Sequence, residues 1–193
     1  MGKLFGTDGI RGVANETLTC RLAYRVGQAA AISLERADGR RPKVVIGKDT
    51  RISSDMLEAA LLAGLTASGC DAVRLGVIPT PAVAYLTVHE QADAGIVISA
   101  SHNPFEYNGI KFFNRDGFKL DDEIEDEIED IILRDIDVNS HITGDKLGRC
   151  LEADDDALDR YADFLKSTLD VDIKGRKLVL DCANGAAYRI AEK

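Results

Sequence analysis

The sequence predicts an α/β sandwich built on a mainly parallel sheet. Short apolar runs alternate along the chain with longer segments whose apolar residues recur at helical spacing. Strands and helices that alternate in this way form parallel sheets, because each helix carries the chain back to begin the next strand in the same direction. The chain has 193 residues and is 45% hydrophobic, which is enough for one large domain or for one domain and part of another.

Residues 17–120 supply most of the predicted elements. Thr17 or Thr19 is expected to cap a helix that runs to about Leu34, because a threonine hydroxyl can accept hydrogen bonds from a first helical turn. The later elements are a strand at 44–46, a helix capped by Ser53 or Ser54 that stops at Gly69, a strand at 72–75, a helix at 80–86, a strand at 94–99, and a strand at 110–113 that turns through 114–117 into 118–120.

The second part of the chain begins with a helix at 121–134 whose isoleucines face inward. Its many carboxylates surround the exposed sides of an amphipathic helix, so we interpret them as a solvated face rather than a cation site. Residues 135–154 lack a clear period and are expected to form a surface connection. A helix at about 156–169 and a buried strand at 177–182 follow, and Asn184-Gly185 is expected to turn into another helix.

The apolar run at 177–182 bears on the division into domains. A strand of this kind needs neighbours on both sides to bury its side chains, and only one strand–turn–helix start is present here. We therefore expect a first domain over residues 1–152 and the truncated start of a second, similar domain over residues 153–193.

The net charge and the cysteine pattern limit the binding partners and the cellular compartment expected for this protein. The net charge is −9 with no basic block, which argues against nucleic-acid binding, although a local cluster of cations could still hold a small anion. No run approaches the ~20 apolar residues that cross a membrane, and the N-terminus lacks a secretion signal. The scattered cysteines include no C-x-x-C pair, so we expect free thiols in a cytoplasmic protein without membrane partners.

The loop 99–104 is the first candidate for chemistry, because parallel sheets bind ligands at the carboxyl ends of their strands. It follows a buried strand and presents the Ser101 hydroxyl at the rim of the sheet, with backbone N–H groups nearby for an anion. A serine hydroxyl is a weak nucleophile that needs a base, a metal or a ready-made covalent group. Without such a context, Ser101 and Asn103 are also ordinary loop formers.

Two residues in or after this loop, His102 and Lys111, each allow more than one role. His102 suggests a Ser–His hydrolase, but adjacent residues of an extended loop point in different directions, and there is no G-x-S-x-G elbow. Lys111 alternates with Ile110 and Phe112 on its strand, and is either an exposed lysine or a partly buried base or phosphate partner with a lowered pKa.

Two glycine-containing segments carry further cations. Residues 5–12 hold Gly9 and Arg11, which either approach a phosphate or simply form a tight turn. In residues 47–51, Lys48 and Arg51 could reach an anion. We favour a structural role there, in which Asp49 pairs with Arg51 and organises the start of the next helix.

Taken together, these segments resemble the phosphohexomutases, and within that family the bacterial phosphoglucosamine mutases. The resemblance is carried, in order, by FGTDGIRG at 5–12, GKDTR at 47–51, PTPA at 79–82, ISASHNP at 98–104, NGIKFF at 108–113 and LDCANG at 180–185. It implies that the fold is the family's first domain, a three-layer α/β/α sandwich with a mainly parallel mixed sheet, within a longer multidomain enzyme. That enzyme interconverts glucosamine 6-phosphate and glucosamine 1-phosphate for the synthesis of UDP-N-acetylglucosamine and the cell wall.

The resemblance also implies roles for single residues. Ser101 matches the phosphoserine that gives its phosphoryl group to the sugar and regains one from a bisphosphate intermediate. Arg11 and Lys111 match residues that contact the phosphoserine, with Lys111 a candidate for proton transfer. His102, Asn103 and Gly9 match residues of the loops around the phosphate.

The family binds one Mg²⁺ through the phosphoserine and the aspartates of an Asp-Gly-Asp loop. That loop does not occur in this sequence, so the chain alone is expected to bind Mg²⁺ weakly and to turn over no substrate. A phosphorylated amino sugar is the implied substrate, and a homodimer through the first domain is the implied assembly. A phosphomannomutase or phosphoglucomutase of the same family, or a non-catalytic scaffold domain, are the alternatives.

Overall fold

The computed structural model describes residues 4–34, 39–138, 141–172 and 174–193. Its centre is a six-stranded sheet in the order β1-β5-β4-β2-β3-β6. The strands are β1 (Ile10–Val13), β2 (Lys43–Lys48), β3 (Asp71–Val77), β4 (Ala94–Ile98), β5 (Tyr107–Asn114) and β6 (Cys150–Glu152). β2 pairs in parallel with β3 and β4, and β3 with β6, whereas β5 runs antiparallel to both β4 and β1. The sheet is therefore mixed and mainly parallel, which confirms the predicted fold class.

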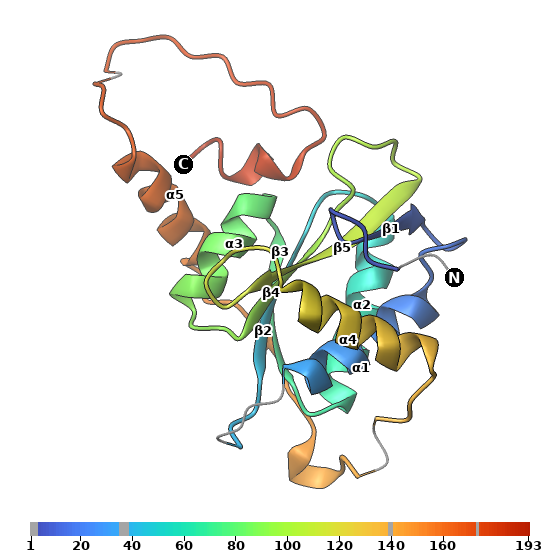
Figure 1. Cartoon of the computed structure of the whole chain (residues 1–193). Helices are drawn as coiled ribbons and strands as arrows, with labels where there is room; N and C mark the ends of the chain where they lie inside the picture. Colours follow the sequence, from blue (N-terminus) through green and yellow to red (C-terminus); the bar gives the residue numbers. More distant parts are fainter. Residues whose placement is uncertain (1–3, 35–38, 139–140, 173) are drawn as a thin grey trace.

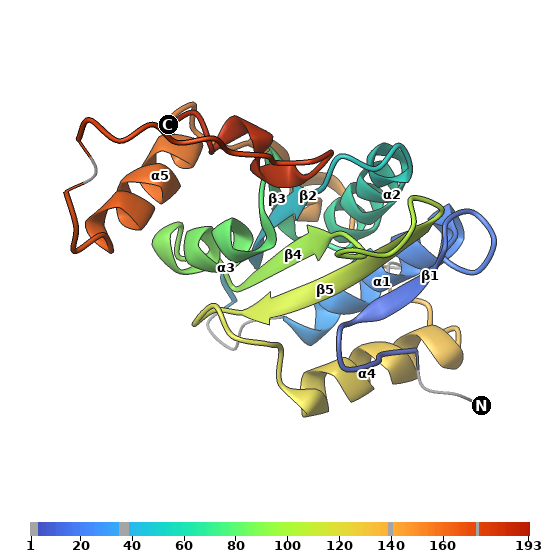
Figure 2. The same ribbon diagram turned by 90° about the horizontal axis from the view of Figure 1, so that it is seen from above.

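Helices cover both faces of the sheet (Figures 1 and 2). One face packs against α1 (Cys20–Ser33), α2 (Ser53–Ala67) and α4 (Asp122–Leu133), and the other packs against α3 (Thr80–His89) and α5 (Ala157–Ser167). Alternation within one strand supplies both layers: Val44 and Ile46 belong to the larger core, and Val45 belongs to the smaller. The result is the expected three-layer arrangement.

The local sequence signals predicted the start of one helix correctly and failed for another. Thr19 caps α1, as one of the two predicted alternatives, and its hydroxyl accepts a hydrogen bond from the Leu22 N–H at 3.2 Å. The capping prediction for α2 was wrong. Neither Ser53 nor Ser54 caps this helix, which begins at Ser53 without a side-chain cap. Both hydroxyls instead accept hydrogen bonds from the amide of Asn108, a partner distant in sequence.

Other strand predictions also need correction. Residues 135–154 were expected to form only a connection, but they contain β6, an edge strand whose three residues are exposed and so give no apolar pattern. Residues 118–120 form no strand, and only a single bridge joins Phe113 to Lys119. The glycine loop 5–12 continues into β1, which is held by pairing with β5.

The C-terminal part divides into two portions. The predicted helix at 156–169 is confirmed as α5, which lies against α3 through stacked and tilted contacts among Tyr85, Tyr161 and Phe164. The predicted buried strand at 177–182 was wrong, because Leu178, Val179 and Leu180 are 60%, 88% and 66% exposed and pair with no strand of the described chain. The helix expected after Gly185 is a single short 3₁₀ turn, Ala186–Arg189.

α5 therefore lies on the face of the first sheet, although the sequence suggested a boundary near residue 152. The division at 152/153 stays a prediction. None of the helices in the described ranges has the length and apolar character needed to span a bilayer.

Candidate functional site

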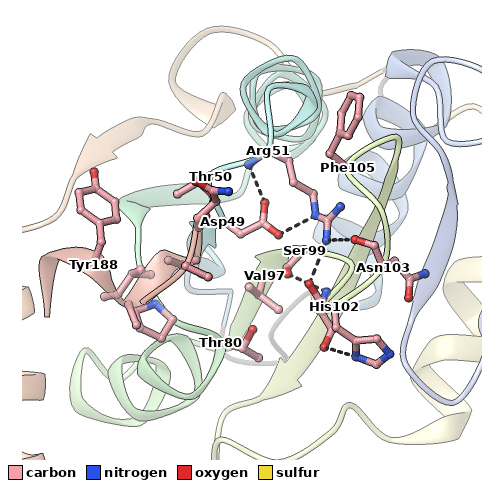
Figure 3. Close-up of a pocket in the computed structure, with 18 of the residues that line it drawn as sticks. Asp49, Thr50, Arg51, Thr80, Val97, Ser99, His102, Asn103, Phe105 and Tyr188 are labelled. Carbon is pink, nitrogen blue, oxygen red and sulfur yellow. Dashed lines mark hydrogen bonds and ion pairs between the residues drawn. The ribbon is translucent and has the colours of Figure 1, made fainter. Parts of the chain in front are cut away.

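A cavity of about 1220 Å³ opens at the carboxyl edge of the parallel strands (Figure 3). Its walls come from the loops that follow β2, β3 and β4, at residues 49–52, 78–81 and 99–105, and from residues 183–188 of the C-terminal segment. The Thr50 hydroxyl donates a hydrogen bond to the Asn184 carbonyl, which joins the first and last of these segments. The loops expected from the position of the strands thus converge on one space.

Ser101 lies in this cavity on a tight turn. The Asn103 N–H donates to the Ala100 carbonyl at 3.1 Å, and the Ser101 N–H donates to the Ser99 hydroxyl at 3.1 Å. Ser101 has φ = +56°, in the left-handed region that glycine usually occupies. A non-glycine residue held there costs on the order of 1–3 kcal/mol and persists only where the surroundings impose it. The chain therefore accepts strain at an exposed residue that lines the cavity.

His102 lies closer to this hydroxyl than the sequence suggested. Its Nδ1 is 3.3 Å from the Ser101 Oγ, within hydrogen-bond range (Figure 3). The argument that adjacent side chains of an extended loop diverge was wrong here, because the segment forms a turn and not an extended loop. A proton can therefore pass between the imidazole and the serine oxygen.

Arg51 crosses from the start of α2 to the serine loop. Its guanidinium donates to the Asp49 carboxylate at 2.9 Å, which confirms the predicted pair, and both side chains are nearly buried. The same guanidinium also donates to four backbone carbonyls, those of Ser101, Asn103, Pro104 and Tyr107, at 2.6–3.0 Å. Sequence reasoning missed these four bonds, because their acceptors are backbone atoms about fifty residues away.

Arg11 and Gly9 lie beside the loop, on and before β1. Arg11 pairs with Gly109 in the ladder, and the Gly109 carbonyl accepts a hydrogen bond from the Ser99 N–H at the start of the serine loop. The Arg11 guanidinium also lies 3.3 Å from the Asp8 carboxylate. Gly9 has φ = +82°, and a Cβ there would lie 2.3 Å from the Ile110 carbonyl oxygen, so only glycine permits this approach to β5.

Lys111 lies on β5 directly opposite Val97, a residue that lines the cavity. Residues opposite each other on antiparallel strands share one face, so the Lys111 side chain leaves the sheet on the cavity side. Its ammonium lies 5.7 Å from the centre of the Phe113 ring. The structure thus places Ser101, His102 and Asn103 in the cavity wall, whereas Arg11, Gly9 and Lys111 occupy the adjoining strands and are not among the lining residues.

Lys48, the other cation considered for anion binding, forms ion pairs within the protein instead. It is buried and contacts the carboxylates of Glu58 and Asp55 at 2.6 and 2.7 Å. Burial alone would lower the pKa of Lys48, but its hydrogen bonds with Asp55 and Glu58 and their charges outweigh this effect and raise it. Lys48 therefore remains charged and neutralised within the protein, as the favoured structural interpretation required.

The described part of the chain holds no group of three or more histidine, cysteine, aspartate or glutamate side chains that could bind a metal ion.

Comparisons with known proteins agree on one family. The family model described as "Phosphoglucomutase/phosphomannomutase, alpha/beta/alpha domain I" matches residues 2–138. The chain is 57% identical to a phosphoglucosamine mutase of Alkaliphilus oremlandii over all of its 193 residues, and 57% identical to one of Clostridium novyi over 98% of its length. It spans only 43% and 42% of those two relatives.

Solved structures show the same similarity. The chain matches a phosphoglucomutase/phosphomannomutase family protein from Burkholderia thailandensis with a TM-score of 0.77 and 29% identity, over 98% of this chain and 41% of that one. Parafusin, a phosphoglucomutase from Paramecium, matches with a TM-score of 0.68 over 88% of this chain and 35% of that one, and at 20% identity it shows the fold alone.

Proposed function

We propose that this chain, which belongs to the phosphoglucomutase/phosphomannomutase family, carries the phosphorylated serine of a phosphoglucosamine mutase. The observation that supports this most strongly is Ser101, which a strained turn holds at the rim of a large cavity. Phosphoryl transfer needs positioning and charge neutralisation more than covalent chemistry by the protein. A cavity of this size accommodates a hexose phosphate with room for other parts of the protein to close over it.

The chemistry of the first step follows from the placement of the side chains. A sugar hydroxyl oxygen attacks the phosphorus carried by the Ser101 Oγ, the Oγ–P bond breaks, and the phosphoryl group moves to the sugar. His102, whose Nδ1 lies beside the Oγ, supplies a proton to the departing serine oxygen. Lys111, in its uncharged amine form, accepts the proton of the attacking hydroxyl and becomes an ammonium, and Arg11 offsets charge on the phosphoryl oxygens. The second step reverses these roles at the other phosphate of the sugar bisphosphate.

Asn103 and Gly9 complete the proposed phosphate surroundings. Asn103 lies in the cavity wall as part of the turn, and Gly9 allows the chain before Arg11 to approach β5 closely. One Mg²⁺ is proposed as the cofactor, held on this side by the phosphate on Ser101. It would neutralise negative charge on the transferring group. Its other ligands are expected in the part of the relatives that this chain does not cover.

The relatives' name and the charge of the chain suggest the remaining properties. The proposed substrate is a phosphorylated amino sugar, glucosamine 6-phosphate or glucosamine 1-phosphate, in preference to mannose or glucose phosphates. The proposed location is the cytoplasm, without nucleic-acid or membrane partners. A homodimer through the first domain is the proposed assembly.

The test uses the protein at the full length of its relatives. Mass spectrometry of peptides from protein purified from cells is expected to find phosphate on Ser101. Ser101→Ala is expected to remove mutase activity while leaving the thermal midpoint nearly unchanged, because an exposed hydroxyl contributes little to stability. Ser167→Ala, an exposed serine at the end of α5, is the matched control and should keep wild-type activity.

Two outcomes would contradict the proposal. Isomerisation at the wild-type rate by Ser101→Ala would exclude a phosphoserine mechanism. An intact wild-type protein that isomerises no hexose phosphate, even with a sugar bisphosphate to prime it, would favour the non-catalytic scaffold. Comparing the phosphates of glucosamine, mannose and glucose as substrates then tests the choice of sugar.

A further inference from the structure

The serine loop has an anchor that the proposed chemistry does not use. Arg51 directs its guanidinium at the loop and donates to four of its carbonyl oxygens. Figure 3 shows the bonds to Asp49 and Asn103. Two of the four carbonyls, those of Ser101 and Asn103, belong to the turn that carries the hydroxyl. The other two, those of Pro104 and Tyr107, lie where the chain leaves the loop and enters β5. Arg51 thus joins both ends of the loop through a single group.

The hydrogen-bond inventory of Arg51 argues against a direct role in binding a ligand. A guanidinium has five N–H donors. In Arg51, the Nε–H goes to Asp49, the two Nη1 donors go to Pro104 and Tyr107, and the two Nη2 donors go to Ser101 and Asn103. No donor is left for a phosphate. A phosphate could recruit Arg51 only by taking it from the carbonyls that fix the loop.

Arg51 affects the conformation of the serine loop because the four carbonyl groups point toward its guanidinium. Carbonyl dipoles that point at one place repel each other unless a cation lies among them. Hydrogen bonds from a charged guanidinium are also shorter and stronger than those from a neutral donor. Arg51 supplies the cation and the donors together, and so stabilises the left-handed conformation of Ser101 that the isolated sequence would avoid.

A network of hydrogen bonds through Asp49 fixes the orientation of the Arg51 guanidinium. The Asp49 carboxylate receives hydrogen bonds from the Arg51 N–H and Nε–H and from the Ser54 hydroxyl. Ser54 in turn accepts from the amide of Asn108, which is fully buried at the start of β5. The network therefore links the end of β2, the start of α2 and the start of β5, which are three rigid parts of the fold.

We propose that Arg51, oriented by Asp49, is the positioning residue of the serine loop, and that it sets the direction of the Ser101 Oγ without contacting the substrate. A lysine cannot replace it, because an ammonium has three donors on a flexible stem and lacks the planar fork. The proposal deepens the proposed function, since the loop it organises is the one assigned to phosphoryl transfer. The claim that Arg51 holds the loop depends only on its hydrogen bonds and not on the proposed function.

The experiment compares Arg51→Lys and Asp49→Asn with wild type in the protein at its relatives' length. In hydrogen exchange, Arg51→Lys is expected to speed exchange in a peptide covering residues 99–107 by at least about tenfold, because local opening of the loop becomes easier. The value of kcat is expected to fall about 10²-fold, as misplacement of a reacting group by ~1 Å does. The KM for the sugar phosphate should stay within about threefold, because no Arg51 donor reaches the substrate. Asp49→Asn should change each quantity in the same direction but less.

Arg134→Lys is the matched control, since Arg134 is exposed at the C-terminal end of α4 and pairs only with Asp130 among the ion pairs of the described residues. It is expected to leave exchange, kcat and KM unchanged. A rise in KM with kcat preserved would show that Arg51 binds the ligand directly and would overturn the proposal. Unchanged exchange in the 99–107 peptide would overturn it as well.

The two proposals fail in different ways. If wild-type protein shows no mutase activity, the proposed function fails, yet the exchange measurement still decides whether Arg51 holds the loop. If wild type is active and Arg51→Lys leaves both exchange and kcat unchanged, only the positioning role fails. Should Arg51→Lys not fold, Asp49→Asn provides the same comparison while retaining the guanidinium.

Discussion

Two apolar segments of this chain differ in burial: β4 is buried, whereas residues 178–180 are exposed. Every residue of β4 is buried, and its side chains enter the cores on both faces of the sheet. Leu178, Val179 and Leu180 are similar in composition, yet most of their surface is exposed. β4 lies between β2 and β5, whereas residues 178–180 have no strand beside them in the described part of the chain.

The difference shows that an apolar run indicates a preference for burial but does not determine whether the segment is buried. A buried strand is stable only when its N–H and C=O groups are paired and both faces are covered. Residues 178–180 have no such partners among the described residues. The relatives are more than twice as long as this chain, which is consistent with partners further along the sequence. We therefore expect residues 177–182 to become a buried strand in the longer protein.

The largest expected effect contrasts these two segments directly. Ile96→Ala in β4 should lower the free energy of unfolding of this chain by about 2–5 kcal/mol, because it removes buried methyl groups and leaves a cavity. Leu180→Ala removes a side chain of the same volume from an exposed position and should change that free energy by less than ~0.5 kcal/mol. Urea denaturation of both variants measures the difference.

Extension of the chain sharpens this test. In the protein at its relatives' length, Leu180→Ala should become destabilising by about 2–5 kcal/mol as well. An equally small cost in both lengths would mean that residues 177–182 never enter a sheet.

A smaller effect is expected at the border between the two regions. Tyr161 on α5 is 4% exposed and packs against Tyr85 on α3. Tyr161→Ala should destabilise the first sheet by about 2–4 kcal/mol, since burial of an aromatic ring is lost within its smaller core. Thermal unfolding followed by the near-ultraviolet signal would detect this change.

The Tyr161 variant also tests the domain division. If the boundary at 152/153 also separates folding units, Tyr161→Ala would leave the main transition unchanged. Phe164→Ala, at a partly exposed position one turn later, serves as the graded comparison and should cost less than Tyr161→Ala.

The smallest effect concerns a surface partner of the buried Lys48. The Lys48 ammonium, through its hydrogen bond and charge, holds the pKa of Asp55 below its ordinary value of 3.8. A lowered pKa stabilises the folded state above pH 3.8, and this contribution disappears as pH falls through the lowered value. Because Asp55 is largely exposed, Asp55→Asn should cost less than ~0.5 kcal/mol at pH 7, and the difference from wild type should vanish in acid.

Urea denaturation of both proteins between pH 7 and pH 3 measures this dependence, with Asp170→Asn as an exposed control. A difference between wild type and Asp55→Asn that grows toward low pH would contradict the assignment.

Local signals predicted the candidate site in part. The strand–loop pattern before Ser101 identified the loop, and the short spacing of Asp49 and Arg51 identified their ion pair. The turn at Ser101 was missed, and with it the contact to His102, because a left-handed serine is unfavourable on its own and occurs only where other contacts impose it. The role of Ser53 and Ser54 as partners of Asn108 was missed for a related reason, since a cap signal describes only the nearest backbone.

The amino-acid sequence by itself determined the alternation of strands and helices and the family. These properties depend on periodicity and on ordered motifs, which are local in the chain. Only the tertiary structure decided which apolar runs are buried, that the exposed residues of β6 join the sheet, and that Arg51 holds the serine loop. Such features depend on groups distant in sequence, and neither a strand nor a strained turn is stable until those groups supply the hydrogen bonds and contacts it lacks.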